Sequence, residues 1–201
     1  MASAFPRSPA PPARDGLWTL PNILSLLRIA AVPFFLWAMI GRQPLAALIL
    51  FAAAGLTDFL DGLAARSLGL RSAWGAVLDP AADKILMTAA YVACSLPALS
   101  KLNVLPLALV ILVIGRDVAI ALGALVLRRL TAKKSFSPSW WGKVSTVCQV
   151  ACLFLVLLFN ALRVRMDIPL SVMYLLTASA TVISGGYYFW VGFLKEFKRS
   201  T

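Results

Sequence analysis

The sequence predicts an all-α polytopic membrane protein in which six transmembrane helices form one bundle. Three observations support this prediction. First, 61% of the 201 residues are apolar. Second, the mean hydropathy is +0.86, well above the range of soluble domains. Third, apolar stretches of about 20 residues, the length a helix needs to cross a bilayer, recur along the chain between short polar segments.

The N-terminal segment differs from the rest of the chain. Residues 1–16 contain four prolines among serine, alanine and arginine. Such a composition buries too little apolar area to order itself, so we expect a flexible tail over residues 1–16. No apolar core precedes residue 17, so we do not expect a cleaved signal peptide. Residues 17–199 are expected to form a single membrane domain.

The first three spans are expected at about residues 22–40, 45–66 and 75–99. Pro21 suits the first turn of a helix, and the segment from Gly41 to Pro44 is typical of a turn between the first two helices. The second and third spans are separated by a short polar loop. Both carry acidic residues at the ends that face this loop, near one membrane surface.

The fourth span, at about residues 104–130, contains Arg116 and Asp117 in mid-helix. Adjacent helical side chains point about 100° apart, so we do not expect these two to pair with each other. One interpretation is that they tie helices together. In the other, Arg116 faces inward and binds a phosphate.

The last two spans are expected at about residues 144–162 and 168–194, and they carry few polar groups. They complete the bundle or support an oligomer, and Gly185 with Gly186 would allow a close helix contact. Trp140 and Trp141 precede the fifth span as interfacial residues. Lys143 either anchors this helix at the membrane surface or contacts an anionic substrate there.

The distribution of basic residues predicts the orientation in the membrane. Six spans place both termini on one side. Eleven lysines and arginines fall on that side: Arg7, Arg14, Arg71, Arg128, Arg129, Lys133, Lys134, Lys143, Lys195, Lys198 and Arg199. Four fall opposite: Arg42, Lys101, Arg163 and Arg165. Because basic loops stay in the cytoplasm, we expect cytoplasmic termini and a cytoplasmic acidic stretch.

The acidic stretch is the strongest functional signal. Four of the eight acidic residues of the chain lie between positions 58 and 83, although carboxylates in membrane helices cost several kcal/mol unless they are paired or hydrated. On helices, Asp58, Asp61, Gly62, Ala65 and Arg66 share one face, and Gly75, Asp79 and Asp83 form a stripe. Four converging carboxylates require a cation, and oxygen ligands favour Mg²⁺ or Mn²⁺ over zinc.

The first span carries a second polar pattern. Asn22, Ser25 and Arg28 recur every three residues on an otherwise apolar helix. In one interpretation, Asn22 and Ser25 satisfy helix-end amides while Arg28 extends to the membrane surface. In the other, the stripe faces the carboxylates and helps bind an anion.

Composition also argues against several classes of protein. The net charge of +11 is explained by basic loops at an anionic membrane surface, so nucleic-acid binding is not expected. The chain has no histidine, which excludes histidine-based triads and histidine-ligated zinc or haem. Any acid-base chemistry therefore falls to Asp, Lys, Tyr or Glu196.

The spacing of the acidic stretch resembles the signature of the CDP-alcohol phosphatidyltransferase family, D-x2-D-G-x2-A-R-x8-G-x3-D-x3-D. Every position of the signature matches, from Asp58 to Asp83. The resemblance implies a six-helix membrane enzyme, usually a homodimer. Such an enzyme transfers a substituted phosphate from a CDP-linked donor to an alcohol and releases CMP.

The resemblance also implies roles for individual residues. Asp58, Asp61 and Asp79 would bind divalent metal, and Asp83 would help hold a second metal ion and act as the general base. The CDP part of the donor would contact the residues Asn22, Ser25, Arg28, Gly62, Ala65, Arg66 and Gly75. The cofactor is thus expected to be two divalent ions, Mg²⁺ or Mn²⁺.

Further segments resemble one branch of the family. The runs from Leu20 to Arg28, from Gly55 to Asp58 and from Gly142 to Thr146 are similar to phosphatidylglycerolphosphate synthases and CDP-diacylglycerol-dependent cardiolipin synthases. The implied donor is CDP-diacylglycerol. We expect glycerol 3-phosphate as the acceptor, bound by Arg116 and Lys143. The alternative is phosphatidylglycerol, because the pair Arg116-Asp117 resembles the cardiolipin synthases.

Two other classes of function, a transporter and a structural scaffold, explain the sequence less completely than a phosphatidyltransferase does. A membrane cation or proton transporter would explain the carboxylates but not the spacing of the glycines and Arg66. A structural scaffold would leave four carboxylates in a membrane without compensation. The lack of a targeting segment favours a bacterial inner membrane, with membrane lipids around the protein and the active site facing the cytoplasm.

Overall fold

The computed structural model describes residues 20–68, 75–130 and 139–191, and within them the side chains of residues 23–57, 78–126 and 139–191. The described residues form helices joined by short loops, without a β-strand. The six helices are α1 (Leu20–Ile40), α2 (Pro44–Leu68), α3 (Gly75–Ser95), α4 (Leu107–Leu130), α5 (Trp140–Ala161) and α6 (Asp167–Phe189). The predicted all-α class is therefore confirmed.

Local sequence accounts for where the helices begin and end. Helix α3 ends at Ser95, four residues before the predicted end of its span, because Pro97 cannot continue a helix. Helix α4 begins directly after Pro106. Helix α5 begins at Trp140, four residues before the predicted start, because the hydroxyl of Ser139 caps it by accepting from the Gly142 amide at 3.0 Å.

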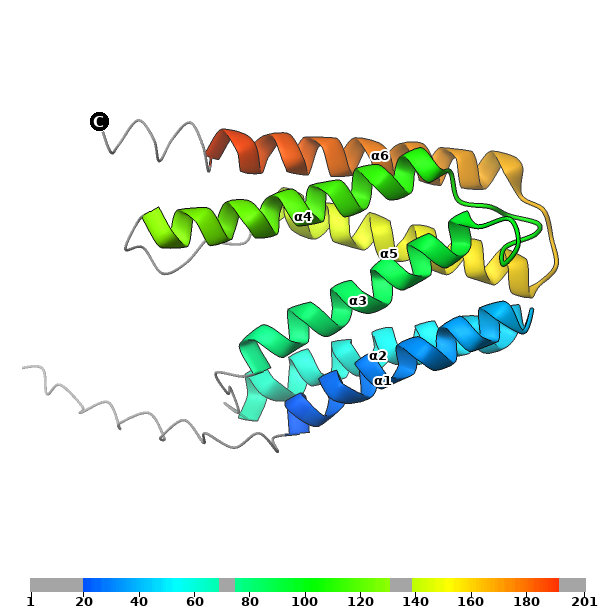
Figure 1. Cartoon of the computed structure of the whole chain (residues 1–201), viewed down its shortest axis with the longest axis horizontal. Helices are drawn as coiled ribbons and strands as arrows, with labels where there is room; N and C mark the ends of the chain where they lie inside the picture. Colours follow the sequence, from blue (N-terminus) through cyan, green and yellow to red (C-terminus); the bar gives the residue numbers. More distant parts are fainter. Residues whose placement is uncertain (1–19, 69–74, 131–138, 192–201) are drawn as a thin grey trace, which may run out of the picture.

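Successive helices run in alternating directions, so their ends gather at two ends of the bundle (Figure 1). The loops at residues 41–43, 96–106 and 162–166 lie together at one end, which we call the loop end. The other end holds the last part of α2 and the first part of α3, and we call it the motif end. Helix α1 packs against both α2 and α3, α6 packs against α4 and α5, and α5 joins the two groups through α2 and α3.

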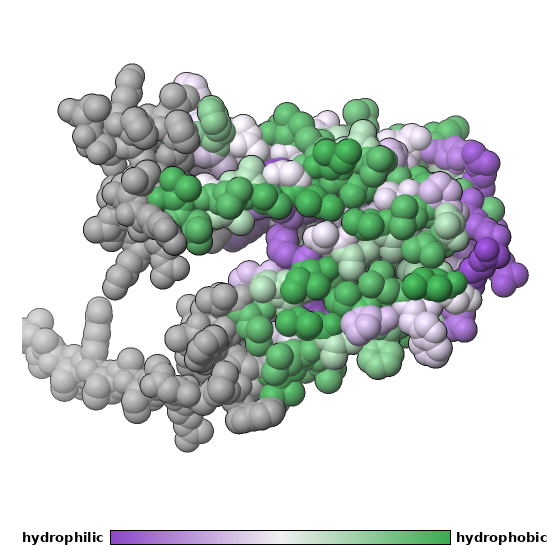
Figure 2. Space-filling model, viewed as in Figure 1, coloured by the Kyte–Doolittle hydropathy of each residue, from purple (hydrophilic) through white to green (hydrophobic). Residues whose placement is uncertain are grey.

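The outer surface of the bundle is mainly apolar. The core contains large buried side chains such as Phe35, Tyr91 and Leu153, yet many leucines, isoleucines and tryptophans face outward. Figure 2 shows this apolar surface along the helices and hydrophilic residues at the loop end. Four helices, α1, α4, α5 and α6, are long and apolar enough to cross a membrane. The part of α2 whose side chains are described, Pro44–Thr57, is apolar as well.

Helices α5 and α6 meet along a polar seam, whereas few polar groups were predicted in these two spans. The seam consists of buried hydroxyl and amide side chains: Ser145, Gln149, Thr177, Thr181 and Ser184. Between the two helices, the Gln149 amide donates to Thr181 at 3.5 Å, and Thr177 donates to the Cys148 carbonyl at 3.3 Å. In a membrane such groups hold helices together because lipid offers them no partners.

The loop end is fixed by two asparagine amides, one buried, Asn103, and one half-buried, Asn160. Asn103 donates to the Val164 carbonyl at 2.8 Å and accepts from the Met166 amide at 3.1 Å. Asn160 donates to Ser100 at 2.9 Å and accepts from the Asn103 backbone amide at 3.1 Å. These bonds tie the loop at residues 96–106 to the loop at residues 162–166.

We expect Asn103→Ala to destabilise the protein by ~2 kcal/mol or more, because the Val164 carbonyl and the Met166 amide lose their partner. In detergent, the melting temperature should fall by about 4–8 °C. The matched control is Ser171→Ala, which changes an exposed side chain of α6 at the same end. Equal melting temperatures for the two variants would contradict this account of the loop end.

Candidate active site

The two described aspartates of the motif lie one turn apart on α3. Asp79 and Asp83 are half-buried and occupy positions i and i+4, so their carboxylates project from the same face of the helix. Gly75 begins the same helix. Both carboxylates thus lie in the half of α3 that is nearer to the motif end.

The other half of the motif lies in the last third of α2. The backbone of Asp58, Asp61, Gly62, Ala65 and Arg66 is helical there, at the end where α2 and α3 face the same loop (Figure 1). The side chains of these five residues, like those of Gly75 and Asn22, lie outside the described residues. The predicted convergence of four carboxylates therefore remains a prediction.

Helix α1 packs against α3 and presents polar side chains to it. The Ser25 hydroxyl donates a hydrogen bond to Oδ1 of Asp79. Arg28, one turn further along α1, is only 3% exposed, so it does not extend to the membrane surface. The interpretation in which Arg28 lies at the surface is wrong, because the close packing of α1 on α3 encloses its side chain. A buried guanidinium needs anionic or polar partners.

A chain of polar contacts extends from α3 to α4 and α6. The Lys84 ammonium lies 2.5 Å from Oδ2 of Asp117, and Nη1 of Arg116 lies 2.8 Å from Oδ1 of the same carboxylate. Nη2 of Arg116 donates to the Ser184 hydroxyl, and its guanidinium lies 5.7 Å from the centroid of the Tyr188 ring. Asp117 therefore binds two cations, one from α3 and one from its own helix.

The pairing of Arg116 with Asp117 corrects the expectation that adjacent side chains would not pair. The guanidinium sits on a long flexible stem and can curl back to the carboxylate, although the two Cα–Cβ bonds diverge. An ion pair is strongly favoured in a nearly enclosed position, and the Arg116 side chain is 10% exposed. The stem of Arg116 passes beside Gly185, where an added Cβ would lie 3.6 Å from Cγ of Arg116, an ordinary van der Waals contact.

Lys84 is a site residue that the sequence analysis missed. It directly follows Asp83, and its side chain, whose ammonium lies beside Asp117, is 39% exposed. A lysine inside an apolar helix, one position after the last aspartate of the motif, was the available signal. Its pairing with Asp117 depends on the approach of α3 and α4, which the sequence alone does not show.

The start of α5 adjoins this chain of contacts through Tyr188. The Tyr188 hydroxyl accepts from the Ser139 amide at 3.1 Å. A Cβ on Gly142 would lie 2.9 Å from the same hydroxyl, so glycine allows the close approach of α5 and α6. Lys143 is exposed on the first turn of α5. The structure brings Arg116 close to Lys84, while Lys143 has no contact with either in the described part of the chain.

The arrangement leaves an opening between the two halves of the bundle. Figure 2 shows the surface hollowed between α3 and α4 toward the motif end, with hydrophilic residues at the inner end of the hollow. The described polar side chains that connect these two helices are Lys84 and Asp117. A charged ligand could thus reach the aspartates from the motif end without crossing the apolar exterior.

The donor set fits a hard divalent cation. Its described members are the carboxylates of Asp79 and Asp83, and oxygen ligands of this kind suit Mg²⁺ or Mn²⁺. Among the described side chains no group of three potential metal ligands occurs. Completing a metal site would therefore require Asp58 and Asp61, whose backbone lies at the same end.

Comparison with known proteins places this site in context. The sequence profile of the CDP-alcohol phosphatidyltransferase family matches residues 18–185. A probable phosphatidylglycerophosphate synthase of Mycobacterium tuberculosis is 35% identical, over 92% of this chain and 87% of its own length. The CDP-diacylglycerol–glycerol-3-phosphate 3-phosphatidyltransferase of Escherichia coli is 33% identical, over 68% of this chain and 75% of its own.

A human protein named cardiolipin synthase (CMP-forming) is 32% identical over 90% of this chain. The match covers 64% of the human protein, so the chain spans less than two thirds of that relative's length. The family profile covers both halves of the aspartate motif, and the relatives match most of the helical region. The chain therefore belongs to the CDP-alcohol phosphatidyltransferase family.

Proposed function

We propose that the protein is a phosphatidyltransferase that moves a phosphatidyl group from CDP-diacylglycerol to an alcohol and releases CMP. The observation that carries the proposal is the aspartate motif, which occupies the last part of α2 and the first part of α3, with Ser25 of α1 bonded to Asp79. The printed names of the relatives support the reaction class, since they include a CDP-diacylglycerol-dependent phosphatidyltransferase and a CMP-forming synthase.

The proposal includes a membrane topology. At 1.5 Å per residue, the 25 residues of α2 and the 21 residues of α3 would extend over ~37 Å and ~31 Å, enough to cross a hydrocarbon core. All six helices would then span the membrane. The bias of basic residues favours a cytoplasmic motif end. An inner bacterial membrane and a homodimer complete the proposal, as the family resemblance suggests.

Two divalent ions, Mg²⁺ or Mn²⁺, would be held by Asp58, Asp61, Asp79 and Asp83. Bound there, they would neutralise the pyrophosphate of the donor and stabilise the CMP leaving group. Buried Arg28 lies one turn from Ser25 on the face of α1 toward α3. It would add positive charge on the side where the CDP part is proposed to bind.

The reaction needs one proton acceptor beside the attacking hydroxyl. The hydroxyl oxygen of the acceptor forms a bond to the phosphorus of the phosphatidyl group, and the bond from that phosphorus to the CMP oxygen breaks. Asp83 takes the hydroxyl proton. Its half-buried position, one turn after Asp79 on the same helix face, is compatible with this role.

Glycerol 3-phosphate is the first candidate acceptor, with Arg116 and Lys143 as the proposed contacts of its phosphate. A specific observation favours phosphatidylglycerol as the second candidate. Asp117 already pairs with both Lys84 and Arg116, which leaves one net positive charge in this group. A phosphodiester with a single negative charge matches that group better than a dianionic phosphomonoester does.

We expect CMP release when purified protein receives Mg²⁺ or Mn²⁺, CDP-diacylglycerol and one of these two acceptors. Serine and inositol serve as control acceptors, and omission of the metal should abolish release. Chromatography of CMP and of the lipid product identifies the acceptor. Absence of CMP with all four acceptors would contradict the enzyme proposal.

We expect Asp83→Asn to lower turnover by about 10²–10⁴-fold, the usual contribution of a general base. Donor binding, measured with radiolabelled CDP-diacylglycerol, should remain, because the amide keeps the size of the side chain. The matched control is Asp167→Asn, which changes an exposed aspartate at the loop end. Near-normal turnover in Asp83→Asn would show that another group takes the proton.

We expect Arg116→Ala to raise the acceptor KM by about tenfold or more, because a charge-assisted contact to phosphate is lost. The control is Ser184→Ala, which removes the bond between α4 and α6 but keeps the guanidinium. An equal change of KM in both variants would assign Arg116 to helix packing. Steady-state kinetics with varied acceptor concentration separates the two outcomes.

A further inference from the structure

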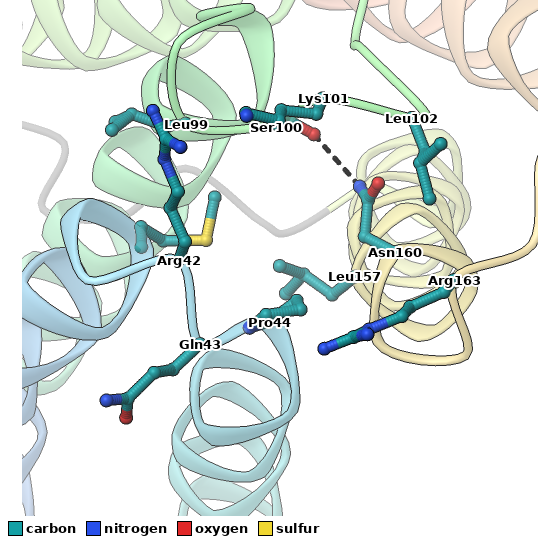
Figure 3. Close-up of a pocket in the computed structure, with 11 residues that line it drawn as sticks. Arg42, Gln43, Pro44, Leu99, Ser100, Lys101, Leu102, Leu157, Asn160 and Arg163 are labelled. Atoms are coloured by element: carbon teal, nitrogen blue, oxygen red, sulfur yellow. Dashed lines mark hydrogen bonds between the residues drawn. The ribbon is translucent and has the colours of Figure 1, made fainter.

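A cavity of about 240 Å³ lies at the loop end of the bundle, opposite the aspartates. Its floor contains apolar side chains such as Met39 and Leu157, and three cationic side chains line it: Arg42, Lys101 and Arg163. Figure 3 shows these cations around the cavity, each from a different interhelical segment. They represent three of the four basic residues that the sequence places on this side of the membrane.

The segments that carry the cations are held in place. Asn160, which also lines the cavity, donates to Ser100 at 2.9 Å (Figure 3) and to the Asn103 carbonyl at 3.0 Å. Asn103 in turn donates to the Val164 carbonyl. The positions of Lys101 and Arg163 are therefore restrained by part-buried hydrogen bonds that hold their loops.

The two arginines occupy an unusual backbone position. Arg42 has a φ of 56° and Arg163 a φ of 57°, in the left-handed region that favours glycine. Each arginine lies just beyond the end of a helix. The backbone amide of the residue that follows it bonds back to a carbonyl in the last turn of that helix. Gln43 donates to Ala38 at 2.9 Å, and Val164 donates to Phe159 at 3.0 Å. Glycine would suit this backbone better than arginine. The presence of arginine at both positions therefore indicates that its side chain has a use that offsets the cost of the backbone conformation.

These cations also lack anionic partners within the described part of the chain. No ion pair there involves Arg42, Lys101 or Arg163. The nearby Asp167 binds Arg165 instead, with both carboxylate oxygens 3.0 Å from Nε. Three like charges around one cavity repel each other, and an anion in the cavity would relieve that repulsion.

We propose that this cavity binds the phosphate headgroup of an anionic phospholipid in the leaflet opposite the proposed active site. Guanidinium and ammonium groups provide charge-assisted donors for phosphate oxygens. The apolar floor and the outward-facing Ile40, Leu45 and Leu162 beside it supply surface for the glycerol and acyl chains. A lipid is favoured over free phosphate because the apolar lining would remain uncovered by phosphate alone.

The test uses full-length protein, delipidated in detergent with EDTA, and phosphatidic acid as the probe. This lipid has no alcohol hydroxyl and cannot serve as an acceptor. Native mass spectrometry measures the apparent Kd, with phosphatidylcholine and inorganic phosphate as separate arms. We expect the protein to prefer phosphatidic acid, with inorganic phosphate neither binding comparably nor displacing the lipid.

The decisive variant is Arg42→Gly combined with Arg163→Gly. Glycine suits the left-handed backbone, so the variant should fold with an equal or higher melting temperature. It should bind phosphatidic acid about 100-fold more weakly, tenfold for each lost charged contact. Lys101→Met should weaken binding about tenfold without touching either helix end, and it provides the test if the double variant does not fold.

Arg165→Gln is the matched control, because Arg165 is an exposed cation at the same end that is paired with Asp167. Its affinity for phosphatidic acid should equal that of the wild type. Unchanged affinity in the double variant or in Lys101→Met would overturn the proposal. Comparable binding of phosphatidylcholine would also overturn it, and displacement of the lipid by millimolar inorganic phosphate would assign the cavity to a free anion.

Discussion

The structure depends on the placement of carboxylates in a chain whose exterior is apolar. A carboxylate surrounded by hydrocarbon is costly, so each one must have a donor, a cation or water. Asp79 accepts from Ser25, and Asp117 binds Lys84 and Arg116. These contacts bring α1 to α3 and α3 to α4. The acidic positions therefore help decide which helices become neighbours in the bundle.

The sequence predicted the all-α class and the helix order, because long apolar runs and prolines at their borders are local signals. It also predicted the stripe of Asp79 and Asp83 on one helix face, since the helical period fixes that geometry. The sequence allowed two interpretations of Ser25, and only one of them placed it near the carboxylates. The choice depends on packing between α1 and α3. No local pattern determines such a contact over 54 positions.

The expectations that were wrong or incomplete all concern how far a side chain reaches or how deeply it is buried. Arg116 was not expected to pair with Asp117, since the argument used Cα–Cβ directions alone and ignored the length of the guanidinium stem. Lys84 was missed because its importance depends on α4. The polar seam of α5 and α6 was overlooked because serine and threonine scarcely lower the hydropathy of a span, although Thr177 and Thr181 are fully buried.

The polar contacts at the loop end and those toward the motif end differ in kind. At the loop end, Asn103 and Asn160 use their amide groups on backbone partners, which fixes loops that have no regular structure. At the motif end, the described charges contact other side chains: Lys84 and Arg116 share Asp117. A contact between side chains can be exchanged for a contact with a ligand without unfolding a helix. A phosphate that competed with Asp117 for Lys84 would meet a cation already placed one residue from Asp83.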